Sequence, residues 1–109
     1  MAGFDPGEMT ARLTLSRPVA VSDGQGGAVV THEAVAALWA RIVPLAAAIE
    51  ERAGAELVTL THRIWIRHRA DMQAGMRLEK GARRFAVKSA HDPDETQRFL
   101  VLSCEEEGP

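Results

Sequence analysis

The fold of this 109-residue chain is decided by the stretch Thr61-His62-Arg63-Ile64-Trp65-Ile66-Arg67-His68-Arg69. From Val58 onward, aliphatic residues and two histidines take the even positions, while the odd positions hold threonines, one tryptophan and three arginines. Side chains on a β-strand point alternately to opposite faces. The pattern therefore predicts a long strand with one mainly apolar face, which suits a core, and one basic face, whose role is a functional question.

Shorter runs of the same kind lie on both sides of this strand and are separated by turn residues. Proline has no backbone N–H to donate, so Pro18 is expected to end the first strand and Pro44 to close the second. Turns are expected at Asp23–Gly27, 70–75, Gly81-Ala82 and Asp92–Thr96. The predicted strands are 11–16, 29–33 with a continuation after a break through 35–43, 57–69, 76–80, 83–90 and 97–104.

These elements predict an all-β protein, a small antiparallel β-barrel of about six strands, in a single domain over residues 1–109. Alternation selects the side chains that should fill the barrel. The expected core is Leu13, Leu38, Ile42, Leu60, Ile64, Ile66, Leu78, Phe85, Val87, Leu100 and Leu102.

Residues 45–57 interrupt the series of strands. This segment is rich in alanine, and Leu45 and Ile49 are four residues apart, which predicts a short helical or mobile excursion with Gly54 as its C-cap. About two helical turns are not stable alone. The excursion is therefore expected to project into a channel or to dock on a partner, and its candidate contact residues are Leu45, Ile49, Glu50, Glu51, Arg52 and Glu56.

Charge is distributed unevenly along the chain, although the net charge is only −2. Residues 61–91 carry 8 basic and 2 acidic groups, whereas residues 92–109 carry 1 basic and 6 acidic groups and end in a predicted frayed acidic tail at 105–109. Complementary segments of this kind suit contacts between copies, although pairing within one copy is an equal alternative. The candidate subunit interface is Arg63, Trp65, Arg67, Arg69, Asp92, Asp94 and Glu95.

Composition excludes several classes of protein. The apolar fraction of 46% is typical of a globular domain, and no run of residues is long enough for a membrane span. The N-terminal residues lack the pattern of a signal peptide. The single cysteine, Cys104, excludes an internal disulfide, so synthesis in the reducing cytoplasm is expected.

No motif for catalysis or for a cofactor is present in the sequence. There is no phosphate-binding loop and no zinc spacing. His62 and His68 would lie about 20 Å apart along a strand, too far to share a metal ion. Cys104 ends an apolar strand and is expected to be a buried thiol. The sequence therefore predicts no enzymatic activity, no cofactor and no metal.

Several short pieces, in this order, resemble the bacteriophage head–tail connector proteins of the head-closure type, also called stoppers or head–tail adaptors. Each piece is weak alone, but their order and spacing cover about 90 residues. The pieces are Leu15-Ser16-Arg17-Pro18, Asp23-Gly24-Gln25-Gly26-Gly27, Leu38-Trp39-Ala40, Pro44-Leu45, Thr61-His62-Arg63-Ile64, Gly75-Met76-Arg77-Leu78, Arg84-Phe85, Asp92-Pro93-Asp94-Glu95 and Leu100-Val101-Leu102-Ser103-Cys104-Glu105.

The resemblance implies a β-barrel that assembles as a ring of six or twelve copies in the neck of a tailed phage, a prophage or a gene transfer particle. Its partners would be a portal or adaptor protein on the head side, a tail terminator or other tail protein, and packaged double-stranded DNA in the channel, with no membrane. Two other classes stay open on the residues alone. One is a barrel that binds single-stranded nucleic acid through the basic strand, and the other is a barrel with an internal ligand pocket.

Overall fold

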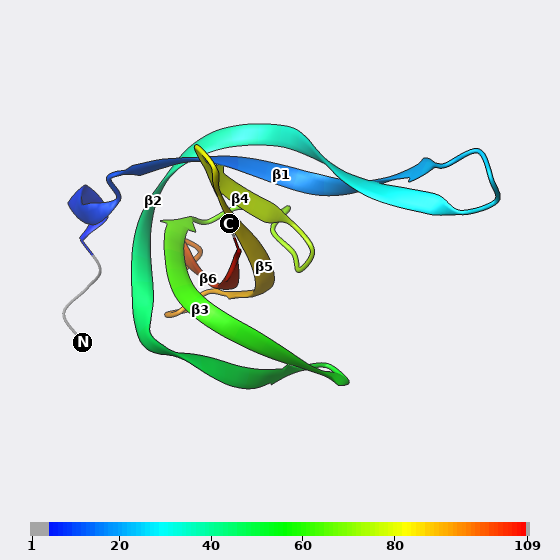
Figure 1. The fold of residues 1–109 in the computed structure, drawn as a ribbon. Helices are drawn as coiled ribbons and strands as arrows, with labels where there is room; N and C mark the ends of the chain where they lie inside the picture. The colour runs from blue at the N-terminus through cyan, green and yellow to red at the C-terminus, as the bar shows by residue number, and fades with distance from the viewer. Residues whose placement is uncertain (1–4, 109) are drawn as a thin grey trace.

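The computed structural model describes residues 5–108, apart from the side chain of Ala53. A six-stranded antiparallel sheet closes on itself in the order β1-β2-β3-β6-β5-β4 (Figure 1). The ring is completed where β4 pairs with β1 through Thr14, Leu15 and Ser16. The elements in chain order are the 3-10 helix η1 (Pro6–Glu8) and the strands β1 (Ala11–Ser22), β2 (Ala28–Ala53), β3 (Glu56–Arg67), β4 (Arg77–Lys80), β5 (Arg83–His91) and β6 (Phe99–Glu107).

The interior of this ring is the hydrophobic core, and it confirms the alternation that the sequence predicts. On β3, Leu60, His62, Ile64 and Ile66 are buried, while the side chains between them are partly exposed. The predicted core residues are all buried except Leu38 and Ile42, which are partly buried and pack against the same cluster. Among residues 5–108 there is no helix with the length and hydropathy of a membrane span.

Two hairpins extend beyond the barrel, and we call them the first arm and the second arm (Figure 1). The first arm is residues 17–33, formed by the end of β1 and the start of β2 around the glycine-rich turn, where Gly24 and Gly26 have φ angles of 78° and 84°. The second arm is residues 45–60, formed by the end of β2 and the start of β3. The arms give the molecule extents of 54 × 28 × 28 Å.

The two prolines that were expected to end strands lie within strands. Pro18 pairs with His32 across the first arm. Beyond Ser16 the partner β4 is absent, so β1 has become an edge, and an edge strand tolerates a residue without an N–H. Pro44 pairs with His62 directly before a register shift in the pairing of β2 with β3. Bulges of this kind are also places where proline is accepted.

The helical prediction for residues 45–57 is wrong. Residues from Ile49 to Ala53 pair in register with β3, from Leu60 back to Glu56, and Gly54 takes a φ of 64° in the turn between the strands. The segment therefore projects as a β-hairpin. Alanine favours helices only weakly, and pairing with the neighbouring strand overrides that preference.

The acidic residues near the C-terminus are also more ordered than a frayed tail. Glu105, Glu106 and Glu107 belong to β6 and pair with Ala86, Phe85 and Arg84 of β5. Their side chains find basic partners within the same chain, since Lys88 lies 3.8 Å from Glu105, Arg83 lies 2.8 Å from Glu106 and Arg77 lies 3.2 Å from Glu107.

Candidate functional site

The outer face of β3 borders a groove of about 860 Å³, which we call the β3/β6 groove. Arg63 and Trp65 of β3, two residues of the predicted subunit interface, line it together with Asp94 from the loop before β6. Apolar side chains complete the groove, namely Val43, Trp65, Phe99 and Val101. Three of the seven predicted interface residues therefore meet in one hollow of the surface.

The charged residues of this groove are paired with one another. Arg63 donates a hydrogen bond of 2.7 Å to Ser103 Oγ and lies 3.7 Å from the carboxylate of Glu51 on the second arm. Arg98 lies 3.0 Å from Asp94. The groove is therefore about half apolar and half polar, and its arginines and carboxylates are paired within the chain.

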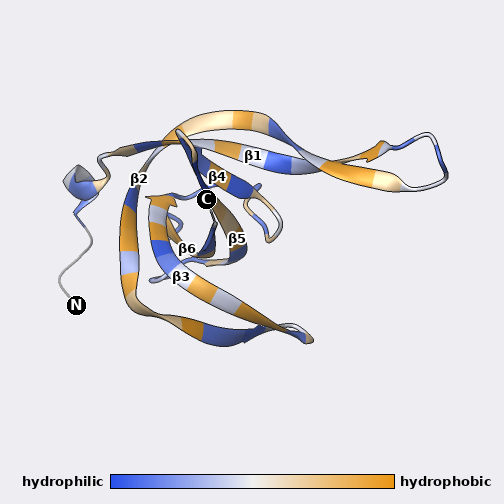
Figure 2. Cartoon of the chain, in the orientation of Figure 1, coloured by the Kyte–Doolittle hydropathy of each residue, from blue (hydrophilic) through white to orange (hydrophobic). Residues whose placement is uncertain are grey.

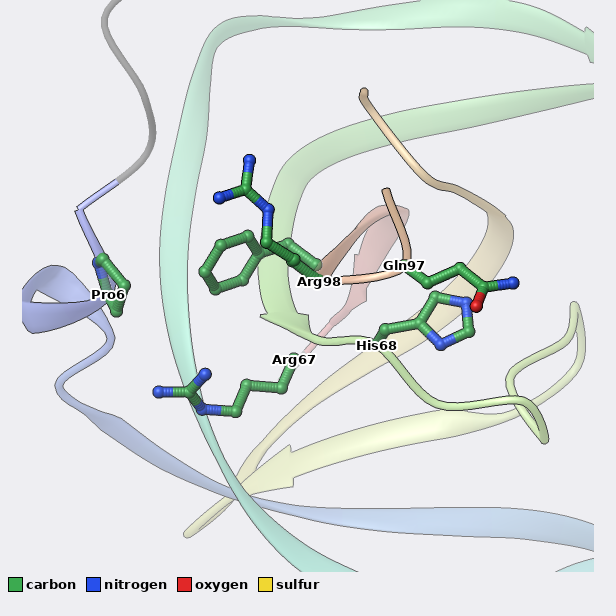
Figure 3. A pocket seen from close by; sticks show the side chains of 6 residues that line it. Pro6, Arg67, His68, Gln97 and Arg98 are labelled. Atoms are coloured by element: carbon green, nitrogen blue, oxygen red, sulfur yellow. The ribbon is translucent and has the colours of Figure 1, made fainter. Parts of the chain in front are cut away.

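Arg67 and Arg69 lie outside the β3/β6 groove. Arg67, His68 and Arg98 line a neighbouring hollow of about 550 Å³ that Pro6 and Gln97 also border (Figure 3). The Arg67 guanidinium stands 6.0 Å from the centre of the Phe99 ring. Arg69 forms two hydrogen bonds of 2.9 Å with Asp71, which lower the pKa of that carboxyl.

Two of the arginines thus have an acidic partner within the same chain. Arg63 has Glu51, from the strand next to β3, and Arg69 has Asp71, two residues further along the chain. Sequence alternation considers only one strand at a time, so it did not reveal either partner. Arg67 is exposed at the end of β3 and stays a candidate for contacts between copies.

The acidic loop at 92–98 is held by its own side chains. Asp92 accepts a hydrogen bond of 2.6 Å from the backbone N–H of Gln97, and Asp94 accepts one of 2.6 Å from Thr96 Oγ1. The bonds from Thr96 and Arg98 lower the pKa of Asp94 to about 2. Glu95 is exposed and has a positive φ of 58°. This loop is shaped as a turn, and no group of metal ligands occurs in residues 5–108.

The arms carry most of the large apolar side chains that are exposed, although Val35 and Trp39 lie outside them. In the second arm Ile49 and Leu57 are 40% and 58% exposed, next to Glu50, Glu51 and Glu56. The predicted contact residues of the excursion therefore lie together on one projecting hairpin, except Leu45, which is partly buried near its base. The first arm exposes Val21, Val29 and Val30. Figure 2 shows hydrophobic stretches along the strands of this arm. This arm was not predicted from the sequence, because Pro18 was expected to end the first strand. The apolar residues on both sides of the glycine-rich turn are a signal that could have revealed it.

One buried titratable group, His62, lies at the end of the core. Its ring is 5.1 Å from the Phe85 ring. Thr61 Oγ1 accepts a hydrogen bond from the N–H of Glu106 and lies 2.8 Å from His62 Nδ1. The Thr61 hydroxyl proton can therefore be donated to Nδ1, which suits a neutral imidazole. Burial lowers the pKa of His62 below 6.5, and Glu106 only partly opposes this.

We expect the stability of the protein to fall as the pH drops below about 6.5, because the unfolded state then binds a proton that folded His62 resists. Urea titrations between about pH 7 and pH 5 should show this slope, and His62→Gln should flatten it. His91→Gln, which changes an exposed histidine, is the matched control. If the free energy of unfolding of His62→Gln still depends on pH as steeply as in the unchanged protein, another group causes the effect.

Cys104 has the buried thiol that the sequence predicts. It is fully buried, and burial raises its pKa to about 12. A thiolate is the reactive form of cysteine, so the side chain is in the wrong state for a nucleophile.

The fold and its surfaces together define a small β-barrel protein with two projecting arms. The chain matches the model of the family described as phage head completion protein over residues 4–107, and it belongs to that family, whose members are structural proteins of the virion. A search of the curated proteins returns no match.

Two solved structures share the fold. One is a chain of the virion of a native gene transfer agent particle, with 24% identity and a TM-score of 0.66, covering 90% of this chain and 94% of that chain. The other is the solution structure of protein SF1141 from Shigella flexneri 2a, with 27% identity and a TM-score of 0.68, covering 96% of this chain and 98% of that chain.

Proposed function

We propose that this head completion protein forms a ring in the neck of a tailed phage, a prophage or a gene transfer particle. The ring sits between the portal or adaptor assembly and the tail, in six or twelve copies, and helps to retain or gate the packaged double-stranded DNA. The observation that carries the proposal is the family match over residues 4–107. The virion particle that contains a chain of the same fold is consistent with it.

The second arm is the part of the chain that we assign to the channel or to a neck partner. It stands clear of the core and carries Glu50, Glu51 and Glu56 against a single arginine, Arg52. Carboxylates that face a channel repel DNA phosphates and line it without binding. The exposed Ile49 and Leu57 offer an apolar contact to the adaptor above or the tail below.

The role in the neck is tested by removing the gene from a strain that produces the particles. Without this chain, we expect heads that are filled and then lose DNA, so that less DNA survives nuclease, and electron micrographs should show heads without tails. Supplying the gene in trans should restore both properties. Complete, tailed particles with protected DNA in its absence would refute the proposed role.

The exposed Arg67 is expected to contact a neighbouring copy in the ring. Arg67 is the basic residue of β3 that stays exposed, and a ring interface joins two different patches of neighbouring copies. Arg67→Glu should therefore slow ring assembly markedly and lower the free energy of unfolding of a single copy only slightly. Added salt should weaken assembly of the unchanged protein. Light scattering during assembly measures both effects. Arg84→Glu, at another exposed arginine on β5, is the control and should assemble normally.

Binding of single-stranded nucleic acid is less favoured by the geometry. Arg63 and Arg69 are already paired with carboxylates of the same chain, so the basic face of β3 is largely compensated. A nucleic-acid groove usually leaves its positive charge available to phosphates.

A further inference from the structure

The first arm has an apolar face that the barrel does not cover. Cross-strand pairing places Val21 opposite Val29 and Val19 opposite Thr31, so these side chains share one face of the two-stranded ribbon. Val21 and Val29 are 48% and 53% exposed. A two-stranded ribbon is marginally stable by itself in water, and exposed apolar side chains along it favour a covering partner.

This arm is also nearly free of charge. Between Pro18 and His32 the only ionisable side chain is Asp23, and its carboxylate accepts hydrogen bonds from the backbone N–H groups of Gln25 and Gly27 in the turn. The first charged pair, Arg17 with Glu33 at 3.5 Å, stands at the base of the arm. The arm can therefore enter an apolar site without the cost of removing water from unpaired charges.

The β3/β6 groove has the matching properties. Trp65, Phe99 and Val101 line its apolar half, and the charges of its polar half are compensated within the chain by the pairs Arg63–Glu51 and Arg98–Asp94. A ligand of this groove therefore needs no net charge. Its volume of about 860 Å³ falls within the usual range of binding sites, about 300–1,000 Å³.

The reach of the arm indicates which molecule fills the groove. Residues 17–23 of the arm span about 23 Å at the usual rise of a β-strand, and the molecule measures 28 Å in its two shorter dimensions. It points away from its own barrel in Figure 1. An adjacent barrel of the same size lies within its span.

We propose that the first arm of one copy places its Val19, Val21 and Val29 face in the β3/β6 groove of a second copy. Arm and groove are different surfaces of the same chain, so the contact is head-to-tail and repeats from copy to copy until a ring closes. The inference rests on the proposed ring and names the surfaces that form it. The apolar contact provides affinity, while Arg67 in the neighbouring hollow contributes orientation.

Purified protein tests the contact by sedimentation velocity at concentrations up to about 1 mM, where weak specific association is measurable. Val21→Asp places a carboxylate on the docking face, and Ser89→Trp fills the groove from β5. Each should weaken self-association by at least about tenfold. Val30→Asp is the matched control, because Val30 is equally apolar and 62% exposed but lies on the opposite face of the arm.

Mixing the two defective variants identifies the partner. Ser89→Trp keeps an intact arm and Val21→Asp keeps an intact groove, so their equimolar mixture should form a heterodimer that cannot extend into a ring. Absence of that heterodimer, equal loss in Val21→Asp and Val30→Asp, or no association of the unchanged protein overturns the contact. If particles made with Val21→Asp are complete while particles made without the gene are not, the docking contact is wrong and the proposed role in the neck stands.

Discussion

Shortening the second arm is expected to give folded protein that no longer completes particles. The variant removes Glu50–Arg52 together with Leu57–Thr59, which are paired segments of the two strands. It keeps the pairing of Ile49 with buried Leu60 and the turn at Gly54, so the core is untouched. Since the lost residues lie outside the core cluster, the unfolding temperature should change little, while particles should leak DNA or lack tails.

A second variant separates the effect of the arm's charge from the effect of its length. Glu50→Gln and Glu56→Gln together keep the hairpin and the Arg63–Glu51 pair and remove two carboxylates of the arm. If the acidic side chains ease the passage of DNA, this double variant should package or eject DNA more slowly but still form tailed particles. If the arm docks a partner through Ile49 and Leu57, the double variant should behave normally and only the shortened arm should fail. Normal particles from the shortened arm refute both roles, and unfolding of that variant makes the arm part of the core.

Phe85→Ala is expected to remove about 3–5 kcal/mol from the free energy of unfolding, a large share of the roughly 5–15 kcal/mol that holds a domain of this kind. Phe85 is fully buried and its ring packs edge-on against His62. The substitution leaves a cavity inside a closed sheet, where the paired strands limit collapse. Urea denaturation measures the loss.

Trp39→Ala is the control for the loss of a large aromatic side chain. Trp39 is 53% exposed and lies under the Arg12 guanidinium at 5.0 Å, so its removal should cost about 1 kcal/mol or less. Similar losses in the two variants would mean that the core is not centred on Phe85.

The barrel was predictable because its signal is local. Alternation along β3 and β5 selects the buried face within a few residues, and the charged loop at 92–98 carries its own turn chemistry. These features need no knowledge of the neighbouring strand. The family resemblance also came from short local pieces.

The arms were not predictable in the same way because their structure depends on pairing at a distance. Ala46, Ala47 and Ala48 favour a helix in isolation, but β3 supplies the partner that makes the adjoining residues a strand. Likewise, Pro18 ends a strand only where both edges are paired, and the absence of β4 beyond Ser16 removes that condition. The ion pair Arg63–Glu51 crosses a hairpin that was expected to be an excursion, and Arg77–Glu107 joins β4 to β6, so charge counts along the chain did not reveal them.

The place of β6 in the ring has a consequence for biosynthesis. This strand is the last of the six in sequence order, but it lies between β3 and β5 and pairs with both. A ribosome must therefore release residues 99–107 before the sheet can close. Until then β3 and β5 present open edges that can pair with other chains. A product terminated before Phe99 would keep those edges permanently, so a premature stop before β6 yields an aggregation-prone fragment instead of a shorter working barrel.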